Sequence, residues 1–154
     1  MRDTVAWWLA TWFGCGYAPV APGTVASAVA IGISWLFARA GFGNLHFLVV
    51  SFALLYPAIW AAGVVAAQSG RKDPGLVVVD EVAGQWLTFA GALRFNWRTF
   101  VIAFLLFRFF DILKPPPIRL IERVPGGSGI VLDDMMAGAY GALVLFIMGW
   151  FTLY

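Results

Sequence analysis

Two apolar runs, residues 45–69 and 130–153, are each long enough to cross a lipid bilayer as a helix. At 1.5 Å per residue, both exceed the roughly 30 Å thickness of a hydrocarbon core. Charged residues make up only 12% of the 154-residue chain and hydrophobic residues 62%, whereas ordinary soluble domains carry roughly 25% charged residues. The sequence therefore predicts an integral membrane protein rather than a soluble helical one.

Three shorter apolar segments, residues 25–38, 82–93 and 99–113, lie between these runs and are separated by glycines, prolines and charges. The segment 82–93 would extend only about 18 Å as a helix, which is too short to cross a bilayer without polar ends that reach the interfaces. We expect an all-α fold, a polytopic membrane helical bundle with four to five membrane-embedded helices. We expect residues 1–154 to form a single domain, because no linker or repeat interrupts them.

Residues 4–13 form an apolar stretch that contains Trp7, Trp8 and Trp12. It is not a convincing signal peptide, because it is short, bulky and nearly uncharged. Tryptophan is favoured at the membrane–water boundary, so we expect a short interfacial N-terminal helix. A buried first helix is the alternative.

Positive charges fall unevenly if the five segments alternate across the membrane. Seven lie on one side: Arg2, Arg71, Lys72, Arg108, Lys114, Arg119 and Arg123. Three lie on the other: Arg39, Arg94 and Arg98. The positive-inside rule places the first side in the cytoplasm. With a net charge of +2 and no basic run longer than two residues, nucleic acid is excluded as a partner.

Five carboxylates lie at predicted helix ends on the cytoplasmic side: Asp80, Glu81, Asp111, Asp133 and Asp134. Ionisable groups near a membrane are costly unless they are paired, hydrated or bound to metal. Oxygen ligands at this density suit Mg²⁺, which often bridges carboxylates to a substrate phosphate. The five residues are therefore candidate catalytic residues and metal ligands. The alternative is that some are acids favoured by the helix dipole.

Phosphate-binding groups are expected beside these acids. Arg108 and Lys114 are candidates for an anion clamp. The alternative for Arg108 is a simple intrahelical ion pair with Asp111, because the two residues are three positions apart. Two glycine-containing loops precede predicted helices, and the free backbone amides of such loops can bind an anion. Thr24, a candidate helix cap, and Gly127 are therefore candidate phosphate-binding residues. Histidine and cysteine phosphatase chemistries are excluded by residue inventory. The only histidine, His46, is predicted on the opposite side, and Cys15 has no arginine six residues later.

Several ordered motifs cover residues 9–145 and together resemble those of the phosphatidylglycerophosphatase A family. They are Phe13-Gly14-Cys15-Gly16, Ala21-Pro22-Gly23-Thr24, Asp80-Glu81 with Gly84-Gln85-Trp86, Phe107-Arg108-Phe109-Phe110-Asp111-Ile112-Leu113-Lys114-Pro115-Pro116-Pro117-Ile118, and Gly126-Gly127-Ser128-Gly129-Ile130 with Asp133-Asp134-Met135-Met136-Ala137-Gly138. Carried over by motif, the family's acidic and basic positions fall on Asp80, Glu81, Arg108, Asp111, Lys114, Asp133 and Asp134.

This resemblance implies a Mg²⁺-dependent lipid phosphatase of phospholipid biosynthesis. It would hydrolyse phosphatidylglycerophosphate to phosphatidylglycerol and phosphate in the bacterial cytoplasmic (inner) membrane, with its active site facing the cytoplasm. Two alternatives stay open, a small membrane transporter and a CDP-alcohol-type lipid phosphotransferase. The transporter would place its acids at the bilayer midplane, and the phosphotransferase would need an Asp-Gly-x-x-Ala-Arg pattern that this chain lacks.

Overall fold

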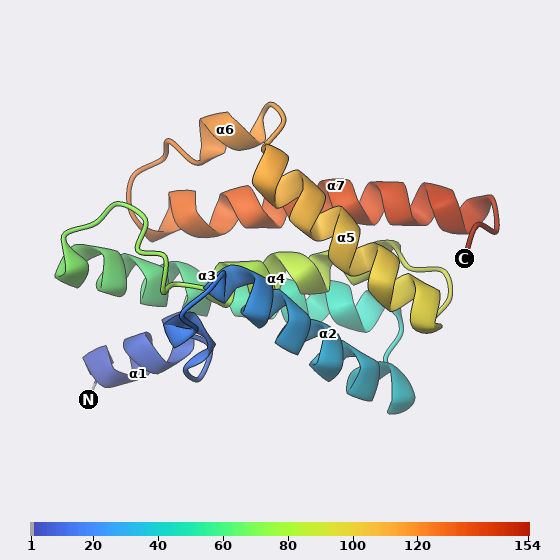
Figure 1. The fold of residues 1–154 in the computed structure, drawn as a ribbon, viewed down its shortest axis with the longest axis horizontal. Helices are drawn as coiled ribbons and strands as arrows, with labels where there is room; N and C mark the ends of the chain where they lie inside the picture. The colour runs from blue at the N-terminus through green and yellow to red at the C-terminus, as the bar shows by residue number, and fades with distance from the viewer. Residues whose placement is uncertain (1) are drawn as a thin grey trace.

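The computed structural model describes residues 2–154, and this part of the chain consists of helices joined by loops, with no β-strand (Figure 1). The predicted all-α fold is therefore confirmed. In chain order, the elements are α1 (Arg2–Ala10), the 3₁₀ turn η1 (Cys15–Tyr17), α2 (Pro22–Arg39), α3 (Asn44–Ser69), α4 (Val79–Thr88), the 3₁₀ turn η2 (Phe89–Gly91), α5 (Trp97–Leu113), α6 (Ile118–Ile121) and α7 (Gly127–Trp150).

All five predicted apolar segments are helical, but their boundaries differ from those expected. α2, α4 and α7 each begin three residues earlier than predicted, at Pro22, Val79 and Gly127. Glycine, proline and acidic residues at these positions resemble loop signals, yet they also occupy first helical turns. Asp133 and Asp134 consequently lie in the second turn of α7, whereas a helix start at residue 130 would place them in or near the first turn. The four-residue helix α6 was not predicted, because it directly follows a run of three prolines.

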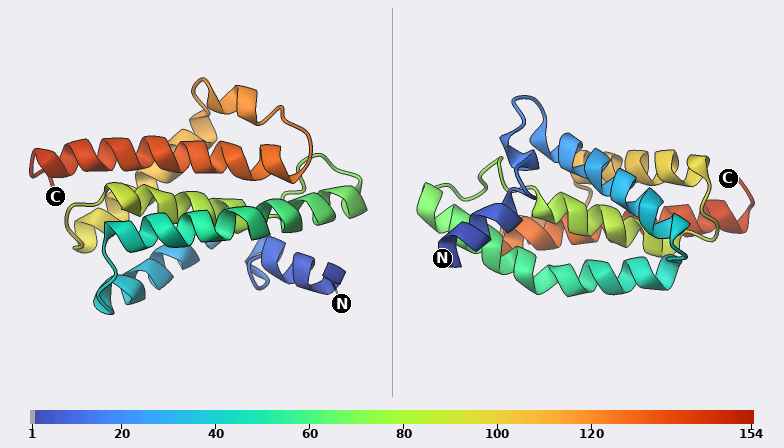
Figure 2. Two further views of the ribbon diagram at one scale, coloured as in Figure 1. Left: turned by 180° about the vertical axis from the view of Figure 1, so that it is seen from behind. Right: turned by 90° about the horizontal axis from the view of Figure 1, so that it is seen from below.

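Two helices in the described part of the chain, α3 and α7, are long and apolar enough to cross a membrane, as their sequences predict. Their most apolar windows have mean hydropathies of 2.1 and 1.8. The other helices do not meet this criterion, so the expected count of four to five membrane-embedded helices is not established. The two long helices run in opposite directions along the molecule (Figures 1 and 2). Helix α4 packs on both of them, α1 packs on α3, α5 and α6 pack on α7, and α2 packs on α4 and α5.

The short helix α4 lies at the centre, where it packs on α7 and on α3 (Figure 2). Every residue of α4 is buried except the half-buried Glu81. α4 can approach α7 closely because Gly84 faces Gly138 there, and a Cβ atom on Gly138 would lie 3.0 Å from the Gly84 Cα. Small residues are the usual means by which membrane helices reach such proximity. This contact brings the start of α4 beside the second turn of α7.

A hydrogen bond between helices also holds α4 in place, because the buried Ser51 hydroxyl of α3 donates to the Ala83 carbonyl over 2.8 Å. Interhelical hydrogen bonds of this kind contribute about 0.6 kcal/mol on average in membrane proteins. Ser51→Ala should therefore lower the free energy of unfolding in detergent by about that amount. Ser69→Ala, which removes only a bond to Ala66 within the same helix, should change it less. An equal loss in both variants would contradict this role.

The N-terminal helix α1 packs on α3 through one face. Ala6 and Ala10 are fully buried, whereas Trp8 is 60% exposed. The Trp7 indole donates to the Gln68 side chain over 2.7 Å and joins the two helices. α1 thus combines features of the expected interfacial helix and of the alternative, a buried first helix. One of its faces is buried, and an exposed tryptophan lies on the other.

Candidate active site

All five predicted carboxylates line one small pocket, whose volume is about 110 Å³. The start of α4, the end of α5 and the second turn of α7 meet there. We call it the carboxylate pocket, and its lining residues are Asp73, Gly75, Val77, Asp80, Glu81, Asp111, Lys114, Ile130, Asp133 and Asp134. The structure therefore brings together predicted carboxylates that lie up to 54 residues apart in the chain, from Asp80 to Asp134.

Three of these acids form an inner group that has the geometry of a metal site. One carboxylate oxygen each from Asp80, Glu81 and Asp134 lies within 4.8 Å of the other two. Asp80 and Asp134 are only 6% and 5% exposed. Two buried oxygens of the group, Asp80 Oδ1 and Glu81 Oε2, have no hydrogen-bond partner among residues 2–154. A cation that bound these oxygens would offset the cost of burying several negative charges together.

The other two acids each form an ion pair with a cation. Asp111 Oδ2 lies 2.7 Å from Arg108 Nη1 on the same helix. Asp133 Oδ2 accepts a hydrogen bond from Lys114 Nζ, also at 2.7 Å. The five carboxylates, all of which were predicted as candidate catalytic residues and metal ligands, therefore separate into an inner group of three and two that are paired with cations.

Arg108 connects the two groups. Its Nη1 atom lies 3.9 Å from Glu81 Oε1 as well as close to Asp111, so the guanidinium makes more than an intrahelical ion pair. The Arg108 Nε atom is buried and has no hydrogen-bond partner in the described part of the chain. A guanidinium can donate through several N–H groups at once, so Arg108 retains a donor for an anion that enters the pocket.

Lys114 connects α5, α6 and α7 at the rim of the pocket. It caps α5 in a left-handed conformation with a φ angle of 44°, and its Nζ atom lies 3.1 Å from Glu122 and 2.7 Å from Asp133. Burial alone would lower the pKa of Lys114, but the hydrogen bond and the charge of Asp133 outweigh burial and raise it above its ordinary value. The lysine is therefore held in its charged form beside the acids.

The two residues predicted at glycine-containing loops differ from expectation. Thr24 does not cap its helix, because α2 begins at Pro22 after the N-cap residue Ala21 and no side chain caps it. Thr24 instead lies in the first turn, next to Gly23, where a Cβ atom would come within 3.5 Å of Arg108 Nη1. Gly127 is buried against the α3 backbone, and a Cβ atom there would lie 2.6 Å from the Gly63 nitrogen. The structure thus gives Gly127 a helix-packing role.

Two further acids at the site were not among the predicted site residues. Asp73 lines the carboxylate pocket from the loop between α3 and α4, and Glu122 pairs with Lys114 from the end of α6. Both are acids in turn-rich loops. Their acidic character was visible in the sequence, but their position beside the other carboxylates depends on how the loops fold back.

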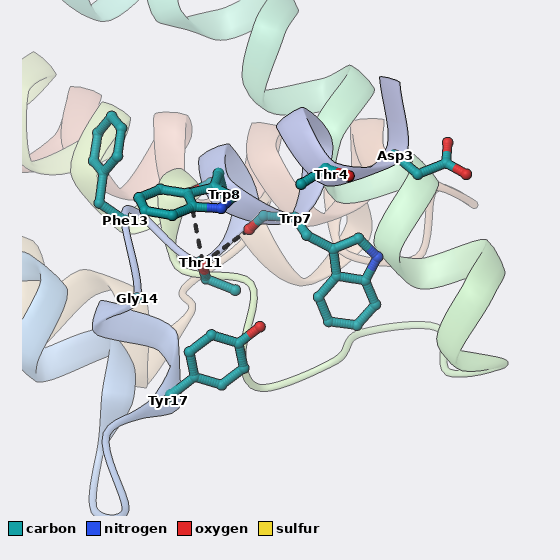
Figure 3. Close-up of a pocket in the computed structure, with 8 residues that line it drawn as sticks. All are labelled: Asp3, Thr4, Trp7, Trp8, Thr11, Phe13, Gly14 and Tyr17. Atoms are coloured by element: carbon teal, nitrogen blue, oxygen red, sulfur yellow. Dashed lines mark hydrogen bonds between the residues drawn. The ribbon is translucent and has the colours of Figure 1, made fainter. Parts of the chain in front are cut away.

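A larger pocket of about 540 Å³ lies apart from the carboxylates, at α1 and η1. Figure 3 shows the rings of Trp7, Trp8 and Tyr17 around Thr11, with Asp3 at the edge. The Thr11 hydroxyl donates to the Trp7 carbonyl over 2.8 Å. Among the described residues that line this pocket, Asp3 is the only carboxylate and none is basic. These residues do not provide the charge needed to bind both a metal and a phosphate.

Comparisons with known proteins agree with the motifs. Residues 8–149 match the family described as phosphatidylglycerophosphatase A. A putative phosphatidylinositol-3-phosphatase of Bacteroides thetaiotaomicron is 37% identical over 92% of this chain and 92% of its own length. Phosphatidylglycerophosphatase A of Escherichia coli is 35% identical over 92% of this chain and 81% of its own.

A third relative, phosphatidylglycerophosphatase A of Haemophilus influenzae, is 35% identical over 94% of this chain and 89% of its own length. No solved structure matches the chain. The family match covers nearly the whole chain, including every residue of the carboxylate pocket. The chain therefore belongs to the phosphatidylglycerophosphatase A family, as its motifs predict, and is a phosphatase.

Proposed function

We propose that this protein hydrolyses phosphatidylglycerophosphate to phosphatidylglycerol and inorganic phosphate in phospholipid biosynthesis. The observation that carries the proposal is the inner group of Asp80, Glu81 and Asp134, with its unpaired buried oxygens, beside the cations Arg108 and Lys114. This combination suits a phosphate held between a metal ion and basic side chains. The names of the Escherichia coli and Haemophilus influenzae relatives support this substrate.

We propose Mg²⁺ as the metal. Asp80, Glu81 and Asp134 would hold it, because their oxygens converge and all are hard ligands of the kind that Mg²⁺ prefers. When bound, such an ion neutralises charge on the phosphate and lowers the pKa of an attacking water. Asp111 and Asp133 stay paired with cations and keep Arg108 and Lys114 in position.

The chain's own residues bind and orient the phosphate. Arg108 would donate from its unpaired Nε atom to a phosphate oxygen. The first turn of α2 lies beside Glu81 and Arg108, where the positive end of its helix dipole favours an anion. A pocket carboxylate would accept the proton of the attacking water as the bond between phosphorus and the glycerol oxygen breaks. The leaving oxygen takes up a proton, which completes the hydrolysis.

We further propose that residues 1–154 act as one domain in the bacterial cytoplasmic membrane, with four to five embedded helices and the carboxylate pocket on the cytoplasmic side. Large apolar side chains exposed on several helices support this, including Leu36, Tyr56, Leu105 and Leu143. Such a surface suits contact with lipid rather than water. The basic residues Arg71 and Lys72, directly after α3, support the cytoplasmic orientation of that end.

The Bacteroides thetaiotaomicron relative favours a second candidate substrate, a phosphatidylinositol phosphate. Both named lipids carry a terminal phosphate monoester on an alcohol that is joined to diacylglycerol through a phosphodiester. The same pocket chemistry therefore serves either headgroup, and the two lipids should be compared side by side as substrates.

The metal requirement gives a direct test. Purified protein in neutral detergent should release phosphate from phosphatidylglycerophosphate with Mg²⁺, and excess chelator should abolish release because the inner carboxylates would then repel the anionic substrate. Adding Mg²⁺ back beyond the chelator is the control and should restore the rate. Undiminished release in chelator would overturn the metal assignment, and no release from folded protein would overturn the proposed function.

A further inference from the structure

A further cavity, of about 310 Å³, lies beside the carboxylate pocket and has the opposite charge. Four cations line it, namely Lys72, Lys114, Arg119 and Arg123, against a single acid, Glu122. We call it the cationic groove. Of these cations, only Lys114 forms an ion pair within residues 2–154. Lys72, Arg119 and Arg123 are therefore gathered at one cavity without an ion-pair partner among the described residues.

The cationic groove and the carboxylate pocket are adjoining. Lys114 lines both cavities. A smaller hollow shares Lys72 and Glu122 with the groove, and Asp73 and Asp133 with the carboxylate pocket. A ligand with two anionic groups could thus place one in each cavity while the part that joins them passes Lys114.

One wall of the groove is apolar. Ile112 and Leu113, at the end of α5, line it and are 70% and 52% exposed. The Arg119 guanidinium donates to the Leu113 carbonyl over 3.3 Å, which keeps a cation beside this wall. Basic groups next to exposed aliphatic side chains suit the part of a phospholipid where the phosphodiester meets the acyl chains.

We infer that the cationic groove binds the phosphodiester of the same lipid molecule whose terminal phosphate enters the carboxylate pocket. The inference rests on the proposed function and assigns Lys72, Arg119 and Arg123 to substrate binding. A phosphatidylglycerophosphate molecule carries these two phosphates on either side of one glycerol unit. The groove would select lipids that have both phosphates over simple phosphomonoesters, because only they engage both cavities.

A general attraction between basic residues and anionic lipid is the competing explanation for the groove. The two explanations differ in whether the effect of removing a cation depends on its position in the protein. Phosphodiester binding requires the cations that line the groove, whereas general surface attraction would depend equally on exposed cations elsewhere on the protein. Arg2 and Arg71 are such cations, since both are exposed and neither lines the groove.

The test compares Arg119→Gln/Arg123→Gln with the matched control Arg2→Gln/Arg71→Gln, in mixed micelles of neutral detergent. Phosphatidylglycerol, which has only the phosphodiester, and inorganic phosphate serve as competitive inhibitors. The groove variant should raise KM for phosphatidylglycerophosphate roughly tenfold and weaken inhibition by phosphatidylglycerol by a similar factor. Its kcat and its inhibition by inorganic phosphate should change by less than about twofold, because neither depends on the phosphodiester.

Three results would overturn the inference. Equal effects in the groove and control variants would indicate surface attraction, and unchanged inhibition by phosphatidylglycerol would show that the groove does not bind the phosphodiester. Equal weakening of both inhibitors would assign the groove to the terminal phosphate. In all three cases the unaltered protein still releases phosphate. If the unaltered protein releases no phosphate, the proposed function fails, and the inference that rests on it fails as well.

Discussion

Asp134→Asn is expected to abolish phosphate release and leave the protein folded. Asp134 is one of the three acids whose oxygens converge within 4.8 Å, and it is only 5% exposed. Asparagine has nearly the same shape but no negative charge, so the site would lose a metal ligand without a change in packing. We expect the rate of phosphate release to fall more than roughly 100-fold, because the remaining carboxylates would not hold the metal in the correct position relative to the phosphate.

The experiment needs a readout of folding and of metal binding besides turnover. Mg²⁺ should raise the thermal unfolding midpoint of the unaltered protein in detergent, because it binds the folded state alone. That shift should disappear in Asp134→Asn. The matched control, Asp3→Asn, removes a carboxylate far from the pocket and should keep both the activity and the shift. Full activity in Asp134→Asn would exclude this residue as a ligand.

Gly84→Leu is expected to destroy the central packing and the activity together. A Cβ atom at Gly84 would lie 2.6 Å from Phe107 Cε2 and 3.0 Å from the Asp134 carbonyl carbon. Because the second contact is with backbone, α4 and α7 would have to separate. Overpacking in a core usually costs about 1–3 kcal/mol, and we expect at least the upper value for a leucine against backbone. Separation would also move Asp134 away from Asp80 and Glu81.

The control for this variant is Gly32→Leu, which introduces the same side chain into a helix where no heavy atom lies within 4 Å of the added Cβ. It should fold normally and be slightly more stable, because leucine favours a helix more than glycine does. Yield of monodisperse protein, thermal unfolding and phosphate release together distinguish the two outcomes. A stable, active Gly84→Leu protein would contradict the close contact of α4 and α7.

Much of the site could be predicted from the sequence, because acids at the ends of apolar segments are visible without a structure. All five predicted carboxylates do line one pocket. The division of these acids into an inner group and two ion-paired residues could not be predicted. Asp133 pairs with Lys114 at the end of another helix. Asp134 lies next to Asp80 and Glu81 of α4. The periodicity of a helix places neighbours three or four residues apart, as for Arg108 and Asp111, but carries no information on residues 50 positions away.

The sequence by itself determined the helical, largely apolar character of the chain, the positions of its main helices and its family. These properties depend on local composition and on ordered motifs, which act within one segment at a time. Only the tertiary structure decided that the short helix α4 is the buried centre, and that three carboxylates stand apart from two paired ones. It also gathered Lys72, Arg119 and Arg123 around one groove. Such features arise from contacts between distant segments, and close approach at Gly84 and Gly138 is what allows them.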